Sequence, residues 1–281
     1  MRLSLIIPTL NRKNMLLGCL GAVLKQTRLP DEILVVDNGS TDGTAEALKT
    51  GFSGCSVRVV REDRRRVDTA RNRGIAEASG DILLFTDDDI LPPRCWIERM
   101  EICFEDPLTA AVGGPVFPLW TGGSSCFLRG STRAQNLLGC LYYGLRRMDI
   151  DDKRHFLTGG NFACRRDLVT GKNGFRGLWK FSGLGMCGSD YELSKRLAKA
   201  HKVVYEPSAY VFHRITPEKM KFTHILKRAF YFEAANTRLG SRLKPKRSIS
   251  QLLGGEGLLS ASVLLGHLYG RLRASRVKRD F

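Results

Sequence analysis

The chain has 281 residues, of which 43% are hydrophobic and 26% are charged. This composition is typical of a globular protein and excludes a disordered or fibrous one. The eight cysteines form no Cys-x-x-Cys pair, so we expect buried thiols in a reducing cytoplasm and no zinc site. The first apolar stretch ends at Pro8, too early for a signal peptide, and we therefore expect the protein not to be exported.

The chain is strongly basic, with 45 Lys and Arg against 28 Asp and Glu and a formal net charge of +17. Residues 215–281 carry 14 basic and 4 acidic side chains, a region that can face nucleic acid, anionic lipid or water. The longest uncharged apolar stretch in it, residues 257–270, is shorter than the roughly 17 to 25 residues that span a bilayer. It can lie on a membrane or pack in a core.

Strand-like runs alternate with helical patterns through the first 115 residues. Strands are predicted at 3–8, 32–37, 57–61, 81–86 and 110–116, and helices at 13–26, 43–49, 67–78 and 93–104. This alternation predicts an α/β fold with βαβ crossovers and a mostly parallel sheet flanked by helices. Ligands of such sheets bind at the carboxyl ends of the strands.

The pattern changes to glycine-rich loops over residues 117–188. Within it we expect one helix near 131–148 and a return to the sheet at 158–165. A helix at 190–200 and strands at 203–205 and 210–213 follow, and the chain beyond residue 217 is helical and basic in pattern.

No glycine-rich phosphate loop follows any predicted strand, because neither G-x-G-x-x-G nor G-x-x-x-x-G-K-[ST] occurs there. The fourth strand instead ends in Thr86-Asp87-Asp88-Asp89. Three adjacent carboxylates repel one another unless a cation compensates, and such hard oxygen ligands suit Mg²⁺ or Mn²⁺ shared with phosphates. The alternative is a solvated loop in which Asp89 caps the next helix.

The second predicted strand ends in Asp37-Asn38-Gly39-Ser40, on the same sheet edge. The carboxamide of Asn38 offers both a donor and an acceptor, as the edge of uracil or thymine requires. These residue types also form turns, and Ser40 or Asp42 can simply cap a helix.

Several motifs occur in one order along residues 2–213. They are Pro8-Thr9-x-Asn11-Arg12, the stretch 36–44 from Val36 to Thr44, Ala70-Arg71-Asn72-x-Gly74, Gly80-Asp81 to Asp89, and Gly159-Gly160-Asn161. In this order the chain resembles family-2 glycosyltransferases, which have the GT-A fold.

The resemblance implies nucleotide-binding roles for a set of residues at the ends of the first, second and fourth strands and in the third helix. They are Thr9, Asn11, Asp37, Asn38, Arg71, Asn72 and Asp87. The family often has two acids where this chain has Asp37-Asn38, which leaves the base open between uridine and thymidine. A guanidinium such as that of Arg71 suits phosphate, although Arg71 could also be a charge on a helix surface.

The Asp triplet matches the D-x-D element of the family, which implies that Asp88 and Asp89 bind Mn²⁺ or Mg²⁺ and that Asp88 is the direct ligand. His213 lies where some relatives have a metal-ligating histidine, and its alternative is an ordinary surface position. Gly159, Gly160, Asn161 and Ser189 are implied to contact the donor or acceptor sugar.

Inversion at the anomeric carbon requires a base for the acceptor hydroxyl. The family uses an Asp at the start of a helix after a glycine-rich loop, which implies Asp190 here, although the family commonly has Glu-Asp in place of Ser189-Asp190. The alternative is structural, since Ser189-x-x-Glu192 is a capping box. No Gln-x-x-Arg-Trp motif follows, so the chain is similar to relatives that add one sugar at a time.

The sequence therefore predicts a GT-A domain at 1–214 and a helical, basic extension at 215–281. The expected activity is transfer of one sugar from a UDP- or dTDP-sugar to a saccharide or lipid-linked acceptor. We expect a cytoplasmic protein, peripheral on the anionic inner face of the cell membrane. A nucleic-acid binder would have aromatic residues among its basic clusters, and a sugar-nucleotide pyrophosphorylase would have a glycine-rich loop with a Lys after the first strand. A non-catalytic relative is the remaining alternative.

Overall fold

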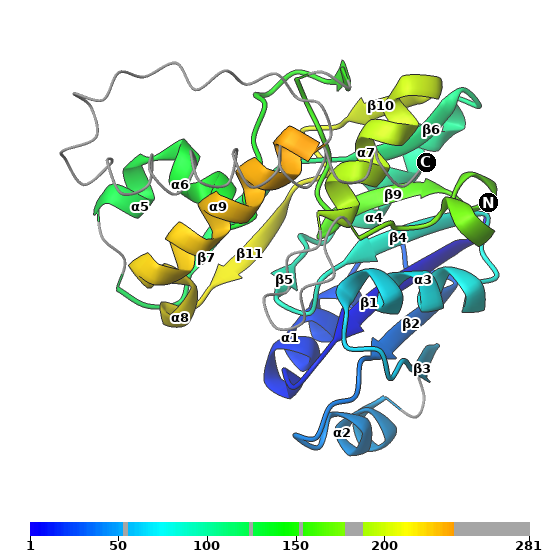
Figure 1. Cartoon of the computed structure of the whole chain (residues 1–281). Helices are drawn as coiled ribbons and strands as arrows, with labels where there is room; N and C mark the ends of the chain where they lie inside the picture. Colours follow the sequence, from blue (N-terminus) through cyan, green and yellow to red (C-terminus); the bar gives the residue numbers. More distant parts are fainter. Residues whose placement is uncertain (53–55, 124–125, 152–153, 178–187, 239–281) are drawn as a thin grey trace, which may run out of the picture. The chain divides into compact units, whose positions relative to one another are not determined.

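The computed structural model describes residues 1–52, 56–123, 126–151, 154–177 and 188–238 (Figure 1). These residues form two compact units. Unit 1 contains Met1–Leu119 and Leu141–Arg214, and unit 2 contains Trp120–Cys140 and the described residues from Ile215 onward.

Unit 1 is built on an eight-stranded sheet in the order β3-β2-β1-β4-β9-β6-β10-β8. The strands are β1 (Leu3–Thr9), β2 (Glu32–Asp37), β3 (Val57–Arg61), β4 (Ile82–Thr86), β6 (Thr109–Gly113), β8 (Met148–Asp149), β9 (Asn161–Arg165) and β10 (Lys202–Tyr205). The predicted mostly parallel sheet is confirmed, with β9 inserted antiparallel between β4 and β6 and with β8 antiparallel to β10.

Helices cover both faces of this sheet. Alternate side chains of β1 point to opposite faces, so Leu5 and Ile7 pack with α1 (Lys13–Val23) and α4 (Trp96–Ile102). Ile6 packs on the other face with α3 (Val67–Glu77) and α7 (Ser189–Ala200). The remaining helices of this unit are α2 (Thr44–Gly51) and the short 3-10 helices η1 (Cys103–Glu105), η2 (Arg166–Leu168) and η3 (Gly171–Asn173). Burial on both faces explains the nearly continuous apolar runs of the parallel strands.

Two sequence-based expectations are wrong in detail. The predicted strand at 110–116 is two strands, β6 and β7 (Val116–Trp120), and β7 joins β5 (Ile90–Leu91) and β11 (Val211–Ile215) in a second sheet. The predicted helix at 131–148 is only α6 (Thr132–Leu137), because Gly139 adopts a φ of +85° and Leu141 then pairs with Val116.

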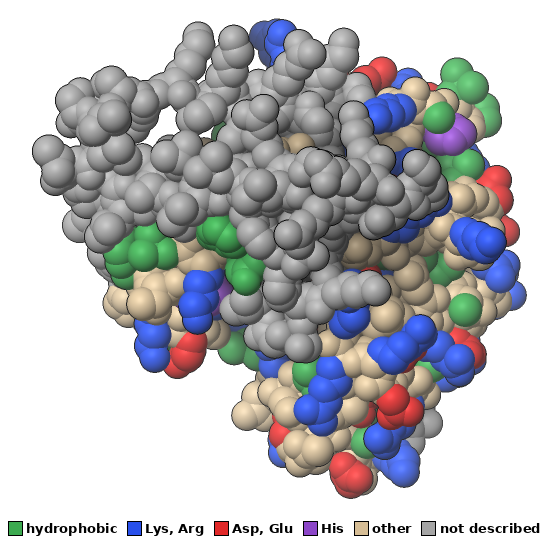
Figure 2. Space-filling model, viewed as in Figure 1, with side chains coloured by type: hydrophobic (Ala, Val, Ile, Leu, Met, Phe, Trp, Pro, Cys, Tyr) green, Lys and Arg blue, Asp and Glu red, His purple; other side chains and the backbone are tan. Residues whose placement is uncertain are grey.

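Unit 2 contains α5 (Cys126–Gly130), α6, α8 (Pro217–Met220) and α9 (Phe222–Arg238). Its core includes Leu137, Ile225 and Ala229, so the apolar stripe of α9 packs inside the unit. Within the described ranges no helix has the length and apolar character needed to cross a membrane. Figure 2 shows acidic side chains interspersed among Lys and Arg on the face that it presents.

Candidate active site

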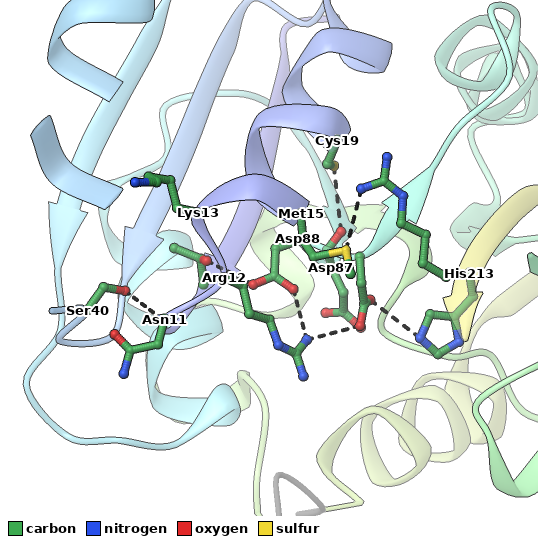
Figure 3. Close-up of polar contacts among 12 residues, drawn as sticks. Asn11, Arg12, Lys13, Met15, Cys19, Ser40, Asp87, Asp88 and His213 are labelled. Atoms are coloured by element: carbon green, nitrogen blue, oxygen red, sulfur yellow. Dashed lines mark hydrogen bonds and ion pairs between the residues drawn. The ribbon is translucent and has the colours of Figure 1, made fainter. Parts of the chain in front are cut away.

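The carboxyl ends of β1, β2 and β4 lie next to one another at one edge of the large sheet. β1 pairs in parallel with β2, where Thr9 lies opposite Asp37, and with β4 on its other side. Asp87, Asp88 and Asp89 directly follow β4. Polar groups from separate parts of the sequence therefore meet at this edge (Figure 3).

Asp88 is a buried carboxylate that contacts Thr9, the last residue of β1, and Arg12, the residue before α1. The Thr9 hydroxyl donates to Asp88 Oδ2 at 2.8 Å, and Arg12 Nη1 donates to Asp88 Oδ1 at 3.0 Å. Burial raises the pKa of Asp88 to about 6, Arg12 opposes this rise, and the charge of Asp89 adds to it. The ionised carboxylate is therefore stabilised by any further positive charge nearby.

Asp89 lies between Arg12 and a histidine from a strand far along the chain. Arg12 Nη1 is 3.0 Å from Asp89 Oδ2, and His213 Nε2 is 3.4 Å from Asp89 Oδ1 (Figure 3). The N–H of Arg214 donates to the Asp89 carbonyl at 2.9 Å, which holds β11 beside this carboxylate.

The donors around Asp89 are compatible with a divalent cation. The described residues contain no preformed group of three or more His, Cys, Asp or Glu that could hold a metal. Asp89 and His213 supply a carboxylate and an imidazole, and Mg²⁺ or Mn²⁺ commonly completes its shell with water and substrate phosphate oxygens. Asp89, and not Asp88, is the carboxylate that faces the histidine.

Arg71 is buried and is held on three sides. Its Nη2 donates to Asp87 Oδ1 at 2.7 Å, and its Cζ lies 5.2 Å from the centre of the Phe175 ring. Gly159 lies so close that a Cβ added there would be 2.5 Å from Arg71 Cζ. The alternative of a charge on the helix surface is therefore wrong, since only 4% of the side chain is exposed.

Asp190 reaches the same region through Gly159. The N–H of Gly159 donates to Asp190 Oδ2 at 3.0 Å, and the N–H of Tyr191 donates to Asp190 Oδ1 at 3.0 Å. Because Gly159 also contacts Arg71, these contacts connect α7 to α3 and to Asp87. Next to Gly159, a Cβ at Gly160 would lie 3.2 Å from Asp87 Oδ2.

The start of α7 differs from the predicted capping box. Gly188 is the N-cap with a φ of +58°, no side chain caps the helix, and Ser189 is its buried first residue. Glu192 pairs with Arg196 at 2.9 Å instead of capping. The predicted glycine-rich loop from residue 183 to 187 lies outside the described residues.

The turn after β2 is ordered by Asn11, which lies just after β1, and by Asp37 at the end of β2. Asn11, with a φ of +52°, accepts from the N–H of Thr41 at 2.7 Å and donates its own N–H to Ser40 Oγ at 2.9 Å. Asp37 Oδ1 accepts from the N–H of Ser40 at 2.9 Å. Asn11 and Asp37 thus shape this turn.

Asn38 uses its amide nitrogen within the protein. The nitrogen donates to the carbonyl of Glu62 at 2.7 Å and to that of Arg64 at 2.8 Å. The donor half of the expected base-reading pattern is therefore engaged in holding the segment after β3.

Two further predicted site residues have structural contacts. The carboxamide of Asn72 pairs with both backbone groups of Phe175, each at 2.8 Å. Asn161 is fully buried, donates to the carbonyls of Pro115 and Ala209 at 2.9 Å, and accepts from Trp96 Nε1 at 2.8 Å. A sugar contact by the Asn161 side chain is therefore not compatible with this structure, since its polar atoms are already bonded.

The sequence prediction did not include Arg12 and Phe175 among the site residues. Arg12 bridges Asp88 and Asp89, and Phe175 stacks beside Arg71. Arg12 lies three residues after the end of β1 and belongs to the motif at residues 8–12, which is a signal in the sequence for its place in the site. Nothing local in the sequence marks Phe175, because its contact with Arg71 is long-range.

Comparison with known proteins identifies the family. The model of glycosyl transferase family 2 matches residues 4–170. The glycosyltransferase AglE of Haloferax volcanii is 28% identical over 233 residues, which cover 81% of this chain and 70% of that protein. The O-antigen chain rhamnosyltransferase RfbN of Salmonella typhimurium is 33% identical over 120 residues, which cover 42% of this chain and 38% of the relative.

Solved structures are similar in fold. The mannosyltransferase PcManGT of Pyrobaculum calidifontis, in complex with GDP-Man and Mn²⁺, has a TM-score of 0.63 and 19% identity, with 98% of this chain and 73% of that chain covered. TarS of S. aureus has a TM-score of 0.59 and 16% identity, with 95% of this chain but 43% of that one covered. The fold is therefore of the same α/β type. The chain belongs to glycosyl transferase family 2.

Proposed function

We propose that the protein is an inverting glycosyltransferase that moves one sugar from a UDP- or dTDP-sugar to a hydroxyl of a saccharide or lipid-linked acceptor. One observation carries this proposal. Asp190 binds Gly159, Gly159 lies against Arg71, and Arg71 binds Asp87, so a candidate base and the acidic strand end share one site.

The nucleotide is proposed to lie along the ends of β1, β2 and β4. Asp37 and the carbonyl oxygen of Asn38 would face the nucleoside. Thr9 binds Asp88 after β4, and Asn11 binds Thr41 after β2, so these two residues order the segments around it. Arg71 holds Asp87 in position, and Asn72 supports Arg71 by fixing the segment at Phe175.

Asp89 and His213 would hold a divalent cation, with buried Asp88 adding negative charge beside them. Such a cation supplies positive charge to the departing nucleoside diphosphate. The Mn²⁺ in the structure of the Pyrobaculum mannosyltransferase supports Mn²⁺ as the first cation to test. Arg12, between β1 and α1, forms ion pairs with both Asp88 and Asp89 and partly neutralises their negative charge.

Asp190 is proposed to accept the proton of the acceptor hydroxyl. The acceptor oxygen then forms its bond to the anomeric carbon while the bond from that carbon to the diphosphate oxygen breaks. The donor nucleotide leaves as its diphosphate. The N–H groups of Gly159 and Tyr191 hold the two oxygens of this carboxylate, which supports a fixed position for the proposed base.

The test compares wild type with Asp190→Asn, which keeps the size of the side chain and removes its basicity. Calorimetry with UDP, dTDP, GDP and CMP, with and without Mn²⁺, measures binding. Release of the same nucleotide from the matching sugar nucleotide measures turnover. We expect Asp190→Asn to bind as wild type does and to lose at least about 100-fold in turnover, within the usual range for acid–base catalysis. Turnover close to that of wild type would exclude Asp190 as the base.

Failure of the folded wild type to bind any of these nucleotides would contradict the enzyme proposal and favour a non-catalytic relative. Arg154→Gln is a suitable control, since Arg154 is 82% exposed and lies outside the site.

We further propose a peripheral contact with an anionic membrane surface, which would bring a lipid-linked acceptor to the site. The basic excess of residues 215–281 supports this proposal, with 14 basic against 4 acidic side chains. The apolar stretch 257–270 lies outside the described residues.

A further inference from the structure

The segment between β3 and α3 is rich in arginine, and most of its guanidinium groups have acidic partners. Arg64 pairs with Glu62 at 2.9 Å, and Arg66 pairs with Asp68 at 2.7 Å. Arg61, at the end of β3, likewise pairs with Asp63 at 2.7 Å. Each of these charges is therefore at least partly neutralised inside the segment.

Arg65 differs from its neighbours. It is exposed, and within the described part of the chain its side chain has no hydrogen bond or ion pair. Its guanidinium lies over the turn after β2, because a Cβ built on Gly39 would be 3.8 Å from Arg65 Nε. Gly39 has a φ of +86° and no side chain, which leaves the space beside Arg65 open.

The position of Arg65 is set by the chain around it. Asn38 holds the carbonyls of Glu62 and Arg64, and the N–H of Glu62 donates to the carbonyl of Asp37 at 2.9 Å. Glu62 and Arg64, which precede Arg65 by three residues and by one, are thus fixed to the end of β2. Arg65 is a positioned cation at the sheet edge that binds the nucleotide in the proposed function.

The strand order decides which part of a nucleotide Arg65 would meet. The edge runs from β4, with its acidic triplet, through β1 and β2 to β3. Neighbouring strands are about 4.8 Å apart, so the end of β3 lies roughly 14 Å from the end of β4. A nucleoside diphosphate whose phosphates lie at the Asp triplet would therefore have its base near Gly39 and Arg65.

We propose that Arg65 selects the nucleobase of the donor, favouring bases with a carbonyl on the edge that faces it. This inference rests on the proposed function. An arginine side chain has only donors, so it pairs with O4 of uracil or thymine, or with O6 and N7 of guanine. Cytosine and adenine present an amino group at the same position, and two donors facing each other form no hydrogen bond.

The experiment is calorimetry of the full chain with two matched pairs of ligands, UDP against CDP and GDP against ADP, in the presence of Mn²⁺. Each pair compares a carbonyl base with an amino base on the same ribose diphosphate. The variants are Arg65→Ala and, as matched control, Arg64→Ala, which removes an adjacent exposed arginine that is paired with Glu62.

Wild type is expected to bind the carbonyl base of at least one pair about tenfold or more tightly than its amino partner. Arg65→Ala should reduce this ratio to within about twofold by weakening the carbonyl base alone, while Arg64→Ala keeps the wild-type ratio. An unchanged ratio in Arg65→Ala, or no carbonyl preference in wild type, overturns the inference.

Failure of the proposed nucleotide site and failure of the role of Arg65 give different results. If wild type binds none of the four diphosphates, the nucleotide site itself is wrong, and the role of Arg65 falls with it. If wild type binds and Arg65→Ala discriminates equally well, the site stands and only the assignment of Arg65 is wrong.

Discussion

Burial of the Asp88 carboxyl group disfavours its ionised form. Its pKa, raised to about 6 by burial, is above that of an exposed aspartate. The folded protein therefore holds the proton more tightly than the unfolded chain does. Protonated Asp88 therefore contributes to the stability of the folded state. This contribution is complete at a pH below about 4 and is lost as the pH rises through about 6.

This predicts that Asp88→Asn, which resembles the protonated side chain, stabilises the metal-free protein at pH 7.5 by on the order of 1–2 kcal/mol. At pH 4.5 the difference from wild type should be much smaller. Urea unfolding at the two pH values measures this directly. Asp63→Asn, at an aspartate that is 79% exposed, is the control and should change little at either pH. Equal effects of Asp88→Asn at both pH values would contradict the argument.

At the residue scale, the sequence predicted which polar side chains gather at the sheet edge but not their partners. Asp87, Asp88 and Asp89 could be grouped because they end one strand of a predicted parallel sheet. The hydrogen bond from Trp96 to Asn161 could not be predicted, because it depends on the position of β9 between β4 and β6, which are distant from it in sequence.

At the scale of elements, the contact of α3 with the segment before β9 depends on the absence of a side chain at Gly159. A Cβ there would lie 2.5 Å from Arg71 Cζ and would push away the guanidinium that holds Asp87. The displaced atoms are the end of a flexible side chain, so the site would be disturbed more than the fold.

We therefore predict that Gly159→Ala lowers turnover by at least about tenfold while costing less than about 2 kcal/mol of stability. Release of the nucleoside diphosphate measures turnover, and urea unfolding of the same preparation measures stability. Gly21→Ala in α1 is the matched control, because a Cβ there meets nothing within 4 Å. The control should keep wild-type turnover and gain about 0.5–1 kcal/mol of stability. Full turnover by Gly159→Ala would show that Arg71 can shift without consequence.

The elements themselves were predicted well where a local pattern is strong. β1, β2 and β3 match their predicted ranges closely, since each is rich in Val, Ile or Leu and lies between turn residues. The helix predicted at 131–148 was wrong, because its pattern could not reveal that Leu141 leaves the helix to pair with Val116. Short strands such as β5, with two residues, carry no periodicity to detect.

For the molecule as a whole, the net charge of +17 is unevenly distributed along the chain. Much of the excess belongs to residues 215–281, whereas Asp and Glu are more frequent in the part that forms the large sheet. Attraction of such a region to anionic lipid is electrostatic and extends over about one Debye length, so it weakens with salt.

Residues 215–281 are expected to bind an anionic membrane surface in the full chain. Sedimentation with vesicles of phosphatidylcholine containing phosphatidylglycerol should show binding at low salt that falls steeply by about 0.5 M NaCl, because the Debye length then shrinks to a few ångströms. Vesicles of phosphatidylcholine alone should bind little. Replacing Arg271, Arg273 and Arg276 by Gln should weaken the binding by on the order of 100-fold, since each basic residue near the surface contributes about 1 kcal/mol. Replacing Arg58, Arg73 and Arg154 by Gln removes equal charge from the large-sheet unit and is the control. If both triple variants lose binding equally, net charge alone governs it, and the C-terminal region has no special role.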